Sequence, residues 1–194
     1  MTGLALGCSH TAGVGVSATE CYVSLLSTHY DCKIINTAVP GGNAENCLKH
    51  LVAQLRVRTP GFVIAQWPNT IRRTHWIGNK SQFENIHNGS AVFLSLLNAG
   101  INNFVQPWLQ CIITADTLCT LAGIKIVHIM LEDLDTKFVD VLDNNNITLH
   151  RDLKQPGQTW LFDSAGSDNL HHSPRCHAQW AERLIGLLNE HTAR

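Results

Sequence analysis

Short hydrophobic runs alternate along this chain with longer segments in which hydrophobic residues recur every three or four positions. The short runs are typical of buried strands, and the longer segments are typical of amphipathic helices. The predicted strands cover residues 4–8, 33–38, 61–67 and 124–131, with a short fifth strand at 159–162. The first predicted helix starts at a capping box at 17–20 and runs through Leu26, and the others cover residues 43–55, 83–97, 104–121 and 174–190.

This alternation predicts an α/β fold with three layers, in which helices cover both faces of a central, mainly parallel sheet of five strands. Residues 132–160 are polar and irregular, and we expect them to form a long surface connection rather than a domain boundary. Residues 1–194 are therefore expected to form a single domain. In sheets of this kind the functional side chains gather at the carboxyl ends of the strands.

Composition narrows the function classes. The 194 residues carry 14 basic and 15 acidic side chains, and 44% of the residues are hydrophobic. This near-neutral balance argues against a surface for nucleic acid or for a membrane. Seven scattered cysteines without a Cys-x-x-Cys pair argue against a disulfide framework and favour a reducing compartment. The N-terminus lacks signal-peptide features and no apolar stretch reaches the ~18 residues of a membrane span, so we expect a cytoplasmic location.

Candidate chemistry lies near both ends of the chain. The stretch GCSHTAG, residues 7–13, places Ser9 directly after the first predicted strand. Near the other end, Asp168 precedes His171 by three residues, a spacing that can put a carboxylate behind an imidazole. A serine hydroxyl becomes a strong nucleophile when a base of this kind removes its proton.

The residues alone leave alternatives open. Ser9 could simply close a turn, and Cys8 could act as a thiol nucleophile, although a cysteine at the end of an apolar strand is more often a small buried hydrophobe. A cluster near the C-terminus also has some metal-ligand character. Its members are His171, His172, Cys176 and His177. Because adjacent histidines point in different directions and no second ligand pair is found, a metal site is disfavoured.

Four blocks of the sequence resemble those of the SGNH (GDSL-like) hydrolases, in the family order and over residues 3–185. GCSHTAG looks like the first block, and residues 36–43 (NTAVPGGN) are similar to the second. Residues 64–69 (IAQWPN) match the third block at Asn69, and residues 168–178 look like the last. The positions where the family usually has aspartate, glycine, aspartate, proline and glycine are occupied here by Cys8, Trp67, Thr70, His172 and Cys176.

The resemblance implies a serine esterase with a flavodoxin-like α/β/α fold of the SGNH type, working without metal or cofactor. Ser9 would attack an ester carbonyl, His171 would accept its proton, and Asp168 would orient the imidazole. The backbone N–H groups of Ser9 and Gly41 and the side-chain amide of Asn69 would hold the oxyanion. The implied substrate is a small ester, foremost an O-acetyl group on a sugar or glycan. The alternative is a carbohydrate-binding or structural module that keeps the fold without turnover.

Two choices inside this site stay open. Gly41 and Gly42 are adjacent, and the spacing of the second block favours Gly41 as the backbone donor. Either His171 or His172 lies close enough in sequence to the carboxylate to be the base, and the register of the last block favours His171. We expect an imidazole nitrogen of His171 to lie within or near hydrogen-bond reach of the Ser9 hydroxyl, ~2.6–3.2 Å and looser without a ligand, and His172 to face solvent or the mouth of the site.

Overall fold

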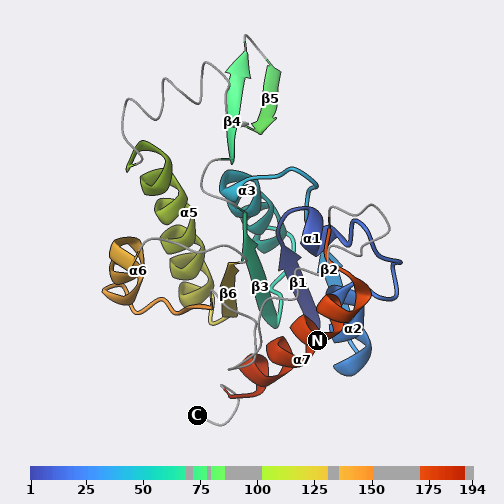
Figure 1. Cartoon of the computed structure of the whole chain (residues 1–194). Coiled ribbons are helices and arrows are strands. Elements are labelled where there is room, and N and C mark those ends of the chain that lie inside the picture. Colours follow the sequence, from blue (N-terminus) through green and yellow to red (C-terminus); the bar gives the residue numbers. More distant parts are fainter. Residues whose placement is uncertain (69–71, 78–79, 86–101, 131–135, 151–170, 191–194) are drawn as a thin grey trace.

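Figure 1 shows the computed structural model of the chain, which describes residues 1–68, 72–77, 80–85, 102–130, 136–150 and 171–190. Within these ranges, residues 72–77, 80–85, 102–104 and 136–139 are described by their backbone only. All structural statements below concern the described residues.

Five parallel strands form the central sheet. They are β1 (Thr2–Leu6), β2 (Lys33–Asn36), β3 (Phe62–Trp67), β6 (Lys125–Met130) and β7 (Leu149–His150). Their order across the sheet is β2-β1-β3-β6-β7, and each neighbouring pair is parallel. Counted in chain order, this is the 2-1-3-4-5 arrangement of flavodoxin-like folds. The predicted fold class is thus confirmed.

Helices lie on both faces of the sheet. They are α1 (Ser9–Ala12), α2 (Tyr22–His29), α3 (Ala44–Leu55), α5 (Asn102–Leu121), α6 (Thr136–Asp143) and α7 (Pro174–Glu190). Helices α3, α5 and α6 share one hydrophobic cluster with the sheet, whereas α2 and α7 share another on its opposite face. Figure 1 shows α7 running beside α2 although the two are far apart in sequence. The sheet therefore has a helical layer on each side.

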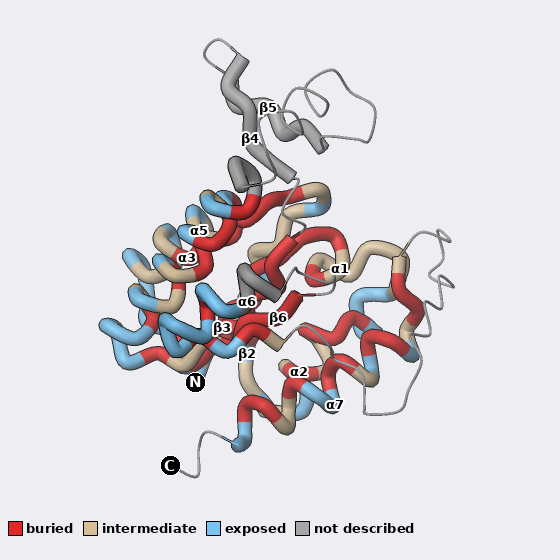
Figure 2. Tube along the Cα trace, turned by 60° about the vertical axis from the view of Figure 1, so that its left-hand side comes forward, coloured by how far each residue is buried: buried red, intermediate tan, exposed pale blue. Residues whose placement is uncertain are grey.

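The alternation of side chains along each strand separates these two clusters. Leu4 and Leu6 of β1 face the α3 and α5 side, while Ala5 between them faces α2 and α7. Strand β3 repeats this pattern, with Val63 on the first side and Ile64 on the second. Figure 2 shows the buried residues concentrated in the strands and on the inner sides of the helices. A strand buried on both faces explains why the predicted strands are continuous hydrophobic runs.

The predicted starts of helices α3 and α7 are confirmed. Asn43 caps α3 in a reciprocal capping box with Asn46, in which each side chain accepts the other residue's backbone N–H. Helix α7 begins at Pro174, where the missing N–H has no cost. The capping box at 17–20 is placed differently. Ser17 does hydrogen-bond Glu20, but the two residues form a turn and α2 begins only at Tyr22.

Two other predictions are corrected. Residues 83–85 belong to a hairpin of β4 (Arg72–Ile77) and β5 (Lys80–Asn85), so they do not start a helix. The rest of that predicted helix, 86–97, lies outside the described residues. Within the supposed irregular connection 132–160, the chain forms α6 and β7. Strand β7 is the fifth strand of the sheet, and the strand predicted at 159–162 lies outside the described residues.

Candidate active site

Ser9 lies at the carboxyl end of β1, in the turn that leads into α1. The strand ends at Leu6, and Ser9 is the first residue of the four-residue helix, which Gly13 ends in a left-handed conformation (φ 78°). The Ser9 side chain is buried with 7% of its surface exposed. Neither its backbone N–H nor its Oγ hydrogen-bonds to another described residue. The first N–H groups of a helix have no intrahelical partner, so this one is free to act as a donor.

The turn below Ser9 is held by Gln66 of β3. The Oε1 atom of Gln66 accepts hydrogen bonds from the backbone N–H of Cys8 (3.2 Å) and from Thr11 Oγ1 (3.1 Å), and Cys8 Sγ also points at it (3.2 Å). Sequence analysis missed Gln66, although a glutamine inside the apolar run FVIAQW was a usable signal. The buried Cys8 thiol is directed at Gln66, which argues against Cys8 as the nucleophile.

The loop after β2 is tied to the same turn. Asn36 donates from Nδ2 to the carbonyl of Thr11 (2.6 Å), and the N–H of Val39 donates to the carbonyl of Gly7 (3.1 Å). The N–H of Gly42 is already used, because it donates to the carbonyl of Val39 (2.8 Å). Gly41 adopts a left-handed conformation (φ 73°), which favours glycine. Of the two adjacent glycines, Gly42 is thus the one whose N–H donates a hydrogen bond within the described residues.

His171 reaches this region from the other end of the chain. Its half-buried ring meets the ring of His10 edge-on, with a centroid distance of 5.2 Å and an interplanar angle of 62°. His10 is the residue after Ser9, so the segment before α7 lies against the Ser9 helix. The hydrogen bond expected between Ser9 Oγ and His171 is not formed among the described residues. The His171 ring does contact the neighbouring imidazole of His10.

His172 is buried, so of its two expected positions, facing solvent or the mouth of the site, the first is wrong. Its side chain is 3% exposed and its ring lies 4.7 Å from the centroids of both His10 and Trp180. The buried indole of Trp180 on α7 packs against the His172 ring and shields it from solvent. Burial lowers the pKa of His172, and the nearby His171 lowers it further. Neutral His172 therefore packs between two rings.

His177 links α7 to α2. Its Nδ1 accepts the backbone N–H of Tyr22 (3.2 Å), and its ring stacks on the Tyr22 ring with centroids 5.9 Å apart. Burial, followed by repulsion from His172, lowers the pKa of His177 to about 4. The hydrogen bond to Nδ1 fixes the proton of the neutral ring on Nε2. His177 is thus a packing residue, distinct from the candidate base.

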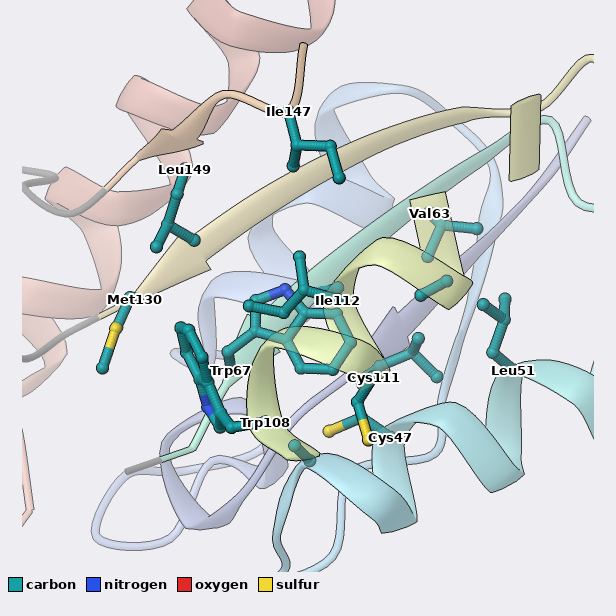
Figure 3. Packing of buried hydrophobic residues seen from close by; sticks show 14 of the residues in the cluster. Cys47, Leu51, Val63, Trp67, Trp108, Cys111, Ile112, Met130, Ile147 and Leu149 are labelled. Atoms are coloured by element: carbon teal, nitrogen blue, oxygen red, sulfur yellow. The ribbon is translucent and has the colours of Figure 1, made fainter. Parts of the chain in front are cut away.

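On the opposite face of β3, the residue in the family's glycine position is part of a second polar network. The fully buried Trp67 donates from Nε1 to His128 Nδ1 (3.0 Å), and His128 Nε2 pairs with Asp116 Oδ1 (3.1 Å). Trp108 lies beside Trp67 (Figure 3) and donates from Nε1 to the carbonyl of Pro68 (2.8 Å). These bonds fix the end of β3.

Asp168 and Asn69 lie outside the described residues, so their predicted roles stay predictions. Within the described ranges, no group of three His, Cys, Asp or Glu side chains is arranged to hold a metal ion. All seven cysteines lie in these ranges, and none forms a disulfide there. No described helix combines the length and hydrophobicity that crossing a membrane requires.

Several solved structures share this fold, and their names describe esterases and lipolytic proteins. No family model and no curated protein matches this sequence. The chain has the SGNH, or G-D-S-L, hydrolase fold, as its superposition on solved members shows. A putative lipolytic protein of the G-D-S-L family from Desulfitobacterium hafniense aligns with a TM-score of 0.62 and 14% identity, over 94% of this chain and 97% of that chain.

Two solved esterases are also similar to this chain in structure, at low sequence identity. The psychrotrophic esterase EstA from Pseudoalteromonas sp. has a TM-score of 0.63 and 16% identity, over 100% of this chain and 99% of that one. The acetyl xylan esterase Est2A from Butyrivibrio proteoclasticus has a TM-score of 0.64 and 11% identity, over 99% of this chain and 64% of that one. At such low identity these likenesses show the fold, and the predicted resemblance is confirmed at that level.

Proposed function

We propose that this protein is a serine esterase of the SGNH type, with Ser9 as nucleophile, His171 as general base and Asp168 as its orienting carboxylate. One observation carries the proposal. On this fold, the turn that presents Ser9 and the segment that carries His171 come from opposite ends of the chain and meet through the ring of His10, 5.2 Å from that of His171.

The reaction divides into two steps. Ser9 Oγ attacks the ester carbonyl while His171 accepts the hydroxyl proton, and the carbonyl oxygen becomes an oxyanion. The N–H groups of Ser9 and Gly41 and the Asn69 amide donate to that oxygen. The C–O bond to the alcohol then breaks, and the leaving alcohol takes the proton from His171. A water molecule, deprotonated by His171, cleaves the acyl-enzyme and restores Ser9.

The proposed substrate is a small ester, foremost an O-acetyl group on a sugar or glycan. Two of the structurally similar proteins are described as acetyl xylan esterases, Est2A and AlAXEase. No charged side chain lies among the described residues that hold the Ser9 turn and the Gly41 loop together, which suits a neutral acyl group. Acetate release from acetylated xylan, compared with hydrolysis of aryl esters of increasing acyl length, tests this assignment. A preference for acyl chains longer than acetyl would contradict it.

Labelling with a fluorophosphonate followed by peptide mapping tests the nucleophile. We expect one label on Ser9, no label in Ser9→Ala, and a loss in kcat on the order of 10³-fold or more, because nucleophile and base act as a unit. The matched control is Cys8→Ala, which changes the adjacent residue and should keep the label. A label on a cysteine, or ester hydrolysis that persists in Ser9→Ala, would sink the assignment.

The second candidate is a binding module that has lost turnover. It is favoured by the altered third block, in which Trp67 and Thr70 stand where the family usually has glycine and aspartate. The same labelling separates the two functions. An unlabelled wild-type protein that binds acetylated xylan would support the module.

A further inference from the structure

We propose that Gln66 is a positioning residue for the nucleophile, which holds the Ser9 turn from the neighbouring strand. The inference rests on the proposed function, and it adds a residue that is not among the site residues implied by the resemblance. Cys8 stands where the resembled family usually has an aspartate before the serine, so no side-chain carboxylate is present in this turn. The amide of Gln66 supplies the acceptor instead.

The hydrogen bonds of Gln66 flank Ser9 on both sides. Its Oε1 accepts from the backbone N–H of Cys8, the residue before Ser9, and from Thr11 Oγ1, two residues after it. An amide oxygen has two lone pairs, and these two donors use both of them, with the Cys8 thiol as a weak third contact. The peptide before Ser9 and the helix after it are therefore held by one atom.

Gln66 is itself fixed in place. Its side chain is 2% exposed, and its Nε2 donates to the carbonyl of Trp67 (3.2 Å), so both ends of the amide are satisfied and its orientation is set. Thr11 is fully buried and its hydroxyl also bonds the Tyr22 hydroxyl (2.8 Å). Because Thr11 donates to Gln66, Tyr22 must be the donor in that bond. Burial raises the pKa of Tyr22, which keeps its hydroxyl protonated.

The close fit at Gly7 shows how tightly the amide packs on the turn. A Cβ atom at Gly7 would lie 2.9 Å from Gln66 Oε1 and would overlap the Thr11 side chain. The chain thus approaches Gln66 as closely as a glycine permits, and the direction of the Cys8 N–H is set by that contact. Ser9 follows directly, so the orientation of its N–H and Oγ depends on Gln66. A misplacement of about 1 Å at such a group can cost ~10² in rate.

The test compares two substitutions at position 66. Gln66→Leu removes the acceptor, while Gln66→Glu keeps an acceptor oxygen in the same place. The matched control is Ser27→Ala, which removes one side-chain hydrogen bond, from Ser27 Oγ to the carbonyl of Cys32 (2.6 Å), at the amino end of β2 and so at the opposite end of the parallel strands from the Ser9 turn. The readouts are kcat and KM for a short-chain aryl ester, the rate of fluorophosphonate labelling at Ser9, and hydrogen exchange at the Cys8 amide.

We expect Gln66→Leu to lower kcat and the labelling rate by ~10–100-fold with KM nearly unchanged, and to speed exchange of the Cys8 amide. Gln66→Glu should recover most of the rate, and Ser27→Ala should leave it within about twofold, because its lost hydrogen bond is remote from the turn. If Gln66→Leu does not fold, Thr11→Val, which removes one of the two donors, should show a smaller loss in kcat. The inference is overturned if wild-type Ser9 is labelled and the folded Gln66→Leu or Thr11→Val is labelled equally fast, or if KM alone changes. An unlabelled wild-type protein instead overturns the proposed function, and with it this inference.

Discussion

Gln66 and Trp67 are neighbours on β3, and their side chains point to opposite faces of the sheet. Both side chains are buried in an apolar strand, and both carry a polar group that is hydrogen-bonded there. The partners of Gln66 belong to the Ser9 turn, which is also linked to α2 through Tyr22. The partners of Trp67 belong to the scaffold of β6 and α5, through His128 and Asp116.

The two networks differ in what their loss should affect rather than in the strength of their hydrogen bonds. The Gln66 network ends on the residues that flank the candidate nucleophile, so its loss should change turnover more than stability. The Trp67 network ends on packed elements, so its loss should change stability more than turnover. The Gly7 and Trp67 predictions below test whether the two faces of β3 divide in this way, and the His177 prediction measures how far packing on the Gln66 face also contributes to stability.

The largest effect is expected from Gly7→Ala. The added methyl group overlaps Thr11 and approaches Gln66, so it must push the turn away from the amide. We expect kcat to fall on the order of 10²-fold and unfolding to become easier by about 1–3 kcal/mol. The control is Gly186→Ala in α7, where nothing lies within 4 Å of the new Cβ and a small gain in stability is expected. Gly7→Ala with full activity would show that the turn tolerates displacement.

An acid-dependent loss of stability is the next largest effect, and it belongs to the Gln66 face. The pKa of His177 is about 4 in the folded chain against an ordinary value of 6.5, so the unfolded chain binds more protons between these values. Stability from His177 is therefore complete above pH 6.5 and is lost as the pH falls toward 4. The loss is on the order of 2–3 kcal/mol by linkage.

Chemical denaturation between pH 4 and 7 measures this effect. The His177→Asn variant removes the titrating group and keeps an acceptor for the Tyr22 N–H, so its stability should depend less steeply on pH than that of the wild type. Other titrating groups contribute equally to both proteins, and the difference between the curves reports His177. If the stability of the two proteins changed with pH to the same extent, the burial of a neutral His177 ring would be contradicted.

The smallest effect is expected from Trp67→Phe. This substitution keeps an aromatic ring and removes the Nε1 donor, which leaves His128 Nδ1 without that hydrogen bond. We expect a loss of about 1–2 kcal/mol in the free energy of unfolding, measured by urea denaturation. The kcat value should stay within about threefold. A loss in kcat as large as that of Gln66→Leu would erase the distinction between the two faces.

Hydrophobic patterning was enough to predict the sheet and its two helical layers, because β1, β3 and β6 are apolar runs that contribute to the hydrophobic clusters on both faces. The hydrophobic pattern did not predict β7 and α6. Strand β7 is only two residues long, and it pairs with β6 through backbone bonds that leave little trace in the sequence. The three asparagines at 144–146 concealed α6, which is only eight residues long.

The candidate site was predictable only where its residues belong to a sequence motif. Ser9 and His171 carry recognisable motifs, and both come close to His10 in the structure. The burial of His172 was not predictable, because it depends on Trp180, a residue of the following helix that turns its indole inward. Gln66 was missed because its role arises from the parallel pairing of β1 and β3, which places it beside residues 55 or more positions away.

The meeting of the two chain ends also sets an order of events during synthesis. The Ser9 turn, the Gly41 loop and Gln66 are all made within the first 67 residues, whereas His171 and α7 come last. At about 5–20 residues per second, the ribosome needs roughly 5–20 s to cover that interval. Until then the α2 face of the sheet lacks Trp180 and Leu184, which cover it in the finished chain. The nascent protein thus carries the proposed nucleophile before the proposed base, so under the proposed function turnover requires α7 to dock first.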